Sequence, residues 1–275
     1  MNDRTVLELE HITKSYGEVA ALSDVSLAVR QGEIHAILGD NSAGKTTLLK
    51  LLAGLLPPEN LSGTISVLGE GAVIRQPRDA IRHGIGVVPR RPGIFPGLTV
   101  ADNIVVGKEM QGLIVNQARL RKEAARLMEI VGLRLDPADK AQKLTPAQQR
   151  LLMIARALSL GTQVVVLDEP AAILTSGQDL SQLFRAVRSL AERDIATLYM
   201  TRRPTEAVQI GDTISVLRDG EIVARTARAD FDETTLIRQM QSQRIGDAGY
   251  VDHDDLGQPR GWLDGIRSLF TGNRG

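Results

Sequence analysis

Residues 6–30 alternate apolar and polar positions, as in VLELEHI and VSLAV. Alternation of this kind gives a strand one face for the core and one for water, so it predicts antiparallel strands with one solvated face. EIHAIL (33–38) and the first half of VVVLDEP (164–170) are instead continuous apolar runs with β-branched residues. Such runs are typical of strands buried on both faces, as in a parallel sheet.

Between and after these strands, apolar residues recur at helical spacing or in short runs. They predict helices over 46–56, 78–83, 117–133, 146–160, 178–193 and 204–210, and further strands over 64–69, 84–88 and 195–200. Thr145 as N-cap and Pro146 as first helical residue mark one helix start. A hairpin over 213–224 is expected to turn at Asp219–Gly220. The alternation of strands and helices predicts an α/β fold whose mostly parallel sheet has helices on both faces.

Three segments differ from this pattern. Residues 89–97 hold three prolines and two glycines and are expected to be a loop. Residues 98–160 are expected to form an inserted helical subdomain of a domain spanning 1–240. Residues 241–275 form a polar tail without periodicity, in which five apolar residues are candidates for one face of a short helix: Trp262, Leu263, Ile266, Leu269 and Phe270.

Composition limits the classes of function. Only 3% of the 275 residues are aromatic, so a core drawn from the 43% hydrophobic residues must be mostly aliphatic. The formal net charge is zero, which argues against a dedicated nucleic-acid binder. Cysteine is absent, which excludes disulfides, thiolate catalysis and cysteine-held metals. Neither a signal peptide nor an apolar run of about 18 residues is found, so any membrane role is expected to act through partner chains.

GDNSAGKT (39–46) fits the phosphate-loop pattern G-x-x-x-x-G-K-[ST]. Gly39 and Gly44 permit backbone conformations that a Cβ forbids, so that backbone N–H groups can converge on phosphate oxygens. Lys45 supplies a charge for the β- and γ-phosphates and Thr46 a hydroxyl for Mg²⁺. The predicted strand before the loop and helix after it support this interpretation. The candidate nucleotide-binding residues here are Gly39, Asp40, Asn41, Ser42, Ala43, Gly44, Lys45, Thr46 and Thr47.

A second motif closes the apolar strand VVVLDEP. Asp168 is placed at the strand end, where a carboxylate can hold Mg²⁺ through water. Glu169 is placed to orient or deprotonate an attacking water. An acidic pair alone is as often an ordinary turn, but downstream of a phosphate loop it indicates a nucleotide hydrolase.

Taken in order, these motifs make residues 5–240 resemble the nucleotide-binding domains of ABC transporters, with a P-loop core, an N-terminal antiparallel β-subdomain and the helical insertion. KSYG (14–17) looks like the loop that contacts adenine, so the resemblance implies that Tyr16 stacks on the base. LTPAQQRLLMIARAL (144–158) stands in the place of the signature helix. Thr145 and Gln148 would then contact a nucleotide bound by a second subunit.

AAILT (171–175) stands at the place of the D-loop, and VLRDGEIV (216–223) matches the closing hairpin. The A-Q-Q of the signature, GIGVV…LTVADNI and LIRQM resemble the subfamily that energises uptake of monosaccharides. The resemblance implies an ATPase with ATP and Mg²⁺ as cofactors, at the cytoplasmic face of the membrane. Its implied partners are a transmembrane permease, a second ATP-binding subunit of the same or another chain, and indirectly a solute-binding protein.

The chain departs from that family at three places. Arg202 stands where a histidine contacts the γ-phosphate and attacking water; it can still bind phosphate but cannot act as an acceptor. Arg90 replaces a glutamine that binds Mg²⁺, and we expect it to point at phosphate, solvent or a partner. Pro146 removes a backbone N–H from the signature. No histidine lies in 195–210 and no glutamine in 85–97.

These departures leave two interpretations open: a slow ATPase, or a degenerate subunit that binds ATP and pairs with a competent partner. Both predict ATP binding, and both predict impaired hydrolysis at this site. A regulatory ATP-binding protein without a transport role is a further alternative. ABC proteins of DNA repair or translation fit less well, because the chain has neither long coiled coils nor tandem domains.

Overall fold

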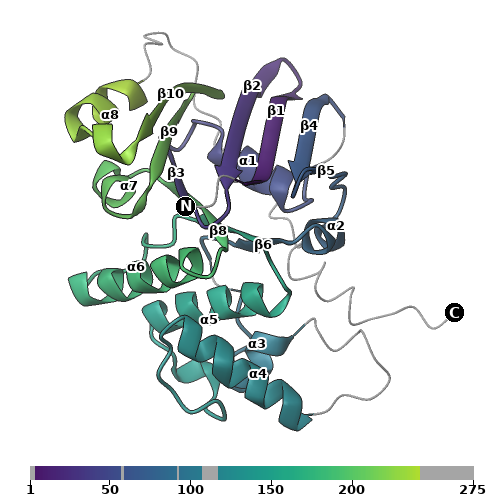
Figure 1. The fold of residues 1–275 in the computed structure, drawn as a ribbon, viewed down its shortest axis with the longest axis vertical. Helices are drawn as coiled ribbons and strands as arrows, with labels where there is room; N and C mark the ends of the chain where they lie inside the picture. The colour runs from purple at the N-terminus through teal and green to yellow at the C-terminus, as the bar shows by residue number, and fades with distance from the viewer. Residues whose placement is uncertain (1–3, 57–58, 92, 107–116, 242–275) are drawn as a thin grey trace, which may run out of the picture.

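The computed structural model describes residues 4–56, 59–91, 93–106 and 117–241 (Figure 1). The apolar segment predicted at 262–270 lies outside these ranges. The strands are β1 (Thr5–Tyr16), β2 (Val19–Arg30), β3 (Ile34–Leu38), β4 (Leu61–Val67), β5 (Glu70–Gly71), β6 (Ile85–Val88), β7 (Val164–Asp168), β8 (Ala196–Thr201), β9 (Thr213–Arg218) and β10 (Glu221–Ala227). The helices are α1 (Lys45–Leu52), α2 (Pro77–Arg82), α3 (Val100–Val105), α4 (Gln117–Ile130), α5 (Pro146–Ser159), α6 (Gly177–Ala191), α7 (Pro204–Ile210) and α8 (Glu233–Met240), with short 3-10 turns at Ala141–Lys143 and Arg228–Asp230.

The strands form two sheets (Figure 1). The first is antiparallel with strand order β2-β1-β4-β5, as the alternating pattern predicts. The second has the order β10-β9-β3-β8-β7-β6 and is parallel except for the β9–β10 hairpin. The predicted α/β class is therefore confirmed, together with the N-terminal antiparallel β-layer.

The parallel sheet has helices on both faces. Along β7, Val164 and Val166 pack in one core with α1 and the antiparallel sheet, whereas Val165 and Leu167 pack in another with α3, α4, α5 and α6. Successive strand residues point to opposite faces, so a strand buried on both sides must be apolar at every position. In Figure 1, α3 and α4 lie below α5, away from the antiparallel sheet.

One helix was predicted too long, and another was not predicted. The helix predicted over 46–56 ends at Leu52, because Gly54 adopts φ +67° and its Cα lies against the backbone of Gln76. A Cβ there would lie 2.4 Å from the Gln76 carbonyl, so the chain turns where only glycine fits. Helix α8 was not predicted. It is short, its N-cap Asp232 accepts a hydrogen bond from the Thr235 N–H, and it buries only Leu236 and Met240.

The turn predictions are confirmed where glycine or a capping residue fixes the backbone. Thr145 caps α5, with Pro146 as the first helical residue. The β9–β10 hairpin turns at Asp219 and Gly220, whose φ values are +51° and +85°. Positive φ at both central residues is the signature of a type I′ turn.

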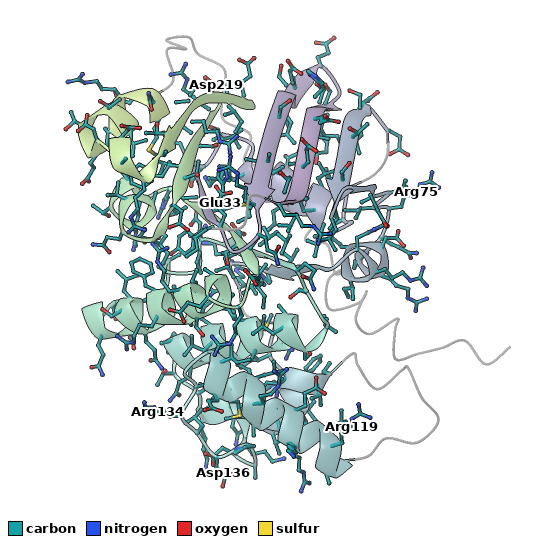
Figure 2. All side chains as sticks on the ribbon, in the orientation of Figure 1. Glu33, Arg75, Arg119, Arg134, Asp136 and Asp219 are labelled. Carbon is teal, nitrogen blue, oxygen red and sulfur yellow. The ribbon has the colours of Figure 1, made fainter. Side chains whose placement is uncertain are left out.

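A buried polar group lies at the start of β3, where Figure 2 labels Glu33. The Glu33 carboxylate accepts the Arg30 N–H at 2.7 Å and lies 3.2 Å from His35 Nδ1, while His35 Nε2 contacts Ser215 Oγ at 2.8 Å. Burial alone would raise the pKa of Glu33, but the contacts with His35, together with those of Thr213 and the Arg30 N–H, outweigh it and lower that pKa to about 2.

We expect the Glu33–His35 pair to make the free energy of unfolding depend on pH in the acid range. A folded-state pKa below the ordinary value stabilises the fold above pH 4.5, and this contribution is lost as pH falls toward 2. Between pH 6 and pH 3 the wild type should therefore lose about 2 kcal/mol more unfolding free energy than Glu33→Gln. Urea unfolding at the two pH values measures this difference, and equal losses in both proteins would contradict it.

Candidate nucleotide-binding site

The phosphate loop joins β3 to α1, as predicted. Gly44 adopts φ +103°, a conformation that glycine tolerates. Gly39 requires glycine for a different reason than the one expected. Its φ is not positive, but a Cβ on it would lie 2.4 Å from the Leu217 carbonyl oxygen and 2.8 Å from the Ala43 Cβ. Space, and not an unusual backbone angle, excludes a side chain there.

Lys45 is the first residue of α1, and its side chain folds back into the loop. Nζ donates to the carbonyl oxygens of Gly39 and Asp40, both at 2.7 Å. Burial lowers the pKa of Lys45, opposed by the charges of Glu169, Asp168 and Asp40. The ammonium thus lies among carboxylates at the mouth of the loop, where a bound phosphate would compete for it.

Tyr16 ends β1 beside the same loop. Its hydroxyl bonds with the side chain of Thr47 in α1, and Lys14 Nζ lies 5.1 Å from its ring centroid. Burial raises the pKa of the hydroxyl, and the Thr47 bond opposes the shift. The structure therefore brings Tyr16 to the N-terminal end of α1, next to the phosphate loop.

The predicted acidic pair follows β7. Asp168 is the last residue of the strand, and Glu169 turns the chain with φ +39° while its N–H donates to the Met200 carbonyl at 2.9 Å. Burial raises the pKa of Asp168, and the neighbouring Glu169 raises it further. Glu169 Oε2 is buried and accepts no hydrogen bond among the described residues. Two close carboxylates with an unsatisfied oxygen are suited to a divalent cation.

Mg²⁺ fits the donor chemistry of these two carboxylates. Magnesium is usually held by one or two carboxylates plus substrate phosphates, and not by a cage of protein ligands alone. Across the residues that the structure describes, no cluster of three or more His, Cys, Asp or Glu could hold a metal. On this principle, Asp168 would hold Mg²⁺ together with the phosphates of a bound nucleotide.

Arg90 was expected to point at phosphate, solvent or a partner, and the structure gives it a different neighbour. Its Nε lies 3.5 Å from Glu169 Oε2, and half of its side chain is exposed. The Arg90 guanidinium thus faces the candidate catalytic carboxylate of Glu169.

Arg202 is exposed in the turn between β8 and α7. Burial and, to a smaller extent, the charge of Arg202 lower the pKa of Lys45. A small pocket beside it is lined by Glu169, Thr201, Arg203 and Glu206. Buried Glu206 accepts from the hydroxyls of Thr201 and Tyr199 and from Arg203 Nη1. Glu206, which sequence reasoning missed, fixes the turn that presents Arg202.

Thr145 and Gln148 lie at the start of α5 and bond each other. Thr145 Oγ1 accepts the Gln148 N–H at 3.3 Å, and Gln148 Oε1 accepts the Thr145 N–H at 2.9 Å. This reciprocal capping box satisfies the helix N-terminus and leaves Thr145 exposed. The structure does not bring the two residues to the chain's own phosphate loop.

Two buried arginines of α5 were also missed by sequence reasoning. Arg150 donates to the carbonyls of Pro89 and Arg90 at 2.5 and 2.7 Å. Arg156 donates to Gly93 O at 2.6 Å and to the backbone and side-chain oxygens of Asn103. Arginine is rarely buried without partners, so their positions in an apolar helix are a signal that could have revealed them. The hydrogen bonds of these two arginines hold in place the loop that carries Arg90.

Comparison with known proteins agrees with this site. Residues 22–172 match the model of a protein family described as ABC transporter. The chain is 38% identical over 243 residues to the ribose import ATP-binding protein RbsA 1 of Burkholderia thailandensis, covering 88% of this chain and 47% of that protein. It is 40% identical to RbsA 2 of Streptomyces avermitilis, covering 86% and 46%. The chain spans about half the length of these curated relatives.

Solved structures share the fold. A nucleotide-free ATP-binding cassette from an ABC transporter superposes with a TM-score of 0.72 at 22% identity, covering 98% of this chain and all of that one. Another cassette in its ADP conformation gives 0.73 at 23%, covering 85% and 98%. Within the described ranges, no helix is long and apolar enough to cross a membrane. The matched family model includes the phosphate loop and the acidic pair, and the chain therefore belongs to the ABC transporter family.

Proposed function

We propose that this chain is the ATP-binding subunit of an importer for a sugar, in which ATP binding and hydrolysis drive transport. The observation that carries the proposal is the buried Lys45 at the mouth of a phosphate loop, facing Asp168 and Glu169. The names of the ribose import relatives support the sugar and do not favour a purely regulatory role. ATP bound to Mg²⁺ supplies the phosphoryl group that hydrolysis releases.

Each residue of the site has a proposed task. Lys45 and the backbone N–H groups of the loop hold the β- and γ-phosphates, and Tyr16 supports the adenine. Thr46 and Asp168 hold Mg²⁺. Glu169 orients the attacking water, so catalysis would consist mostly of positioning and charge stabilisation.

The partners follow from the same proposal. Thr145 and Gln148 lie at the start of α5, apart from the phosphate loop. They would contact the nucleotide of a second ATP-binding subunit. That subunit is either a copy of this chain or another one. Closure of the pair would act on a transmembrane permease at the cytoplasmic face of the membrane, supplied with solute by a binding protein. Residues 98–160 would form the helical subdomain of a domain spanning 1–240.

Hydrolysis at this site should be slow. Arg202 stands where a histidine would accept a hydrogen bond near the γ-phosphate, and an arginine only donates. We expect the wild type to bind ATP and hydrolyse it slowly, and Arg202→His to raise the rate about 100-fold, the lower end of the range for one positioned proton-transfer group.

Steady-state ATP hydrolysis with ATP binding measured in parallel tests this expectation. Glu169→Gln is the companion variant, which should retain binding and abolish the remaining turnover. Fast wild-type turnover that Glu169→Gln removes would show that Arg202 is accommodated, and the claim of slow hydrolysis would be wrong. Failure of the wild type to bind ATP would reject the proposed function itself.

A further inference from the structure

The contact between Arg90 and Glu169 is incomplete as an ion pair. A single nitrogen, Nε, approaches Glu169 Oε2 at 3.5 Å, and that oxygen accepts no hydrogen bond among the described residues. A guanidinium that fully engages a carboxylate forms two parallel bonds at about 2.8 Å. Arg90 therefore compensates the buried charge of Glu169 without being locked to it.

The backbone of Arg90, in contrast, is fixed. Arg150 has no exposed surface, and its guanidinium donates to the carbonyl oxygens of Pro89 and Arg90. The loop therefore cannot shift easily, but the Arg90 side chain is half exposed and can rotate. This combination of a held backbone and a free side chain suits a residue that changes partner while its neighbours stay in place.

The alternative partner lies close by. The Glu169 N–H donates to the Met200 carbonyl at 2.9 Å, and the Gly39 N–H, at the start of the phosphate loop, donates to the Thr201 carbonyl at 3.2 Å. Glu169 and the phosphate loop thus bond neighbouring residues of β8, so a phosphate held by the loop would lie near Glu169 and Arg90. Phosphate offers a guanidinium several oxygens in a geometry that allows two bonds, which Glu169 does not supply here.

We infer that Arg90 is a positioning residue with two alternating partners, Glu169 when no γ-phosphate is present and the γ-phosphate when ATP is bound. Its transfer frees Glu169 to hold water and makes the site prefer ATP over ADP. The inference rests on the proposed ATP site. It differs from what a glutamine at this position would provide, since only a cation can pair with both anions.

The test compares affinities for a non-hydrolysable ATP analogue and for ADP, both with Mg²⁺, in the full chain. Arg90→Gln should weaken binding of the analogue about tenfold, the effect of one charged hydrogen bond, and that of ADP less than twofold. Arg90→Lys keeps the positive charge but loses the planar pair of N–H donors. Its affinity for the analogue should therefore fall between those of the wild type and Arg90→Gln. The matched control Arg91→Gln removes the exposed neighbouring arginine and should change neither affinity.

A second background separates phosphate binding from mere neutralisation of Glu169. In Glu169→Gln there is no carboxylate charge left to neutralise. If Arg90 binds the γ-phosphate, adding Arg90→Gln should still weaken the analogue about tenfold in this background, as a double-mutant cycle measures. Loss of the effect there would overturn the inference, as would equal weakening of the analogue and ADP. A wild type that binds neither nucleotide would instead refute the proposed function.

Discussion

Lys45→Ala should lower the affinity for ATP at least about 100-fold, and that for ADP, which lacks the γ-phosphate, at least about tenfold. Among the described residues, Lys45 is the only cation that the backbone of the phosphate loop holds in place. It donates to the carbonyls of Gly39 and Asp40. A charged hydrogen bond in a buried site contributes about 1.5–3 kcal/mol, and the lysine offers donors to two phosphates. Titration with a fluorescent nucleotide measures the loss.

The variant also tests the electrostatics of the empty site. Burial lowers the pKa of Lys45, so its removal relieves a desolvated charge, but it leaves Asp168 and Glu169 without a neighbouring ammonium. We therefore expect thermal stability to change little while binding weakens. Lys50→Ala, in the last turn of the same helix, is the matched control and should bind as the wild type does. Near-normal binding by Lys45→Ala would mean that the loop does not hold the phosphates.

Removal of Lys45 and removal of Arg90 should change the affinities for ATP and ADP differently. Lys45 is placed for both β- and γ-phosphates, so its removal should weaken ADP as well as ATP. Arg90 faces Glu169, and we infer that only a γ-phosphate reaches it. Agreement with this contrast would assign the γ-phosphate to both cations and the β-phosphate to Lys45 alone.

Sequence patterns predicted those parts of the fold that local chemistry determines. The start of α5 follows from Thr145 and Pro146, and the β9–β10 turn from Asp219 and Gly220, because each acts within four residues. The end of α1 was missed because it depends on Gln76, more than twenty residues away. Helix α8 was missed because two buried residues, Leu236 and Met240, give too weak a periodic signal.

In the site, too, local motifs were predictable from the sequence and long-range contacts were not. The residues of the phosphate loop and of the acidic pair are contiguous, so a motif reveals them. The contacts of Arg90 with Glu169 and of Arg150 with residues 89–90 join segments about 60 to 80 positions apart. In the sequence, the position of Arg150 within an apolar helix signals burial, but nothing local indicates which carbonyl oxygens it binds.

Arg150→Met should lower the free energy of unfolding by about 3 kcal/mol, because it leaves the carbonyls of Pro89 and Arg90 without donors. Methionine keeps most of the volume, so the cost reflects lost hydrogen bonds and not a cavity. Burial lowers the pKa of Arg150 to about 10, which remains far above neutrality, so the wild-type guanidinium stays charged and donates strongly. Urea unfolding measures the effect, with the exposed Arg126→Met of α4 as a control expected within about 0.5 kcal/mol of wild type.

A local measurement then shows whether the lost energy belongs to the loop. Trypsin can cleave between Arg90 and Arg91, and the held backbone should protect that bond in the wild type. Arg150→Met should be cleaved there faster under native conditions, and it should also lose the preference for ATP over ADP that we assign to Arg90. Destabilisation without faster cleavage at this bond would make Arg150 a general element of the core. Faster cleavage with an unchanged nucleotide preference would separate the anchoring of the loop from the action of Arg90. Both effects together would show that α5, through one buried arginine, sets the position from which Arg90 reaches its partners.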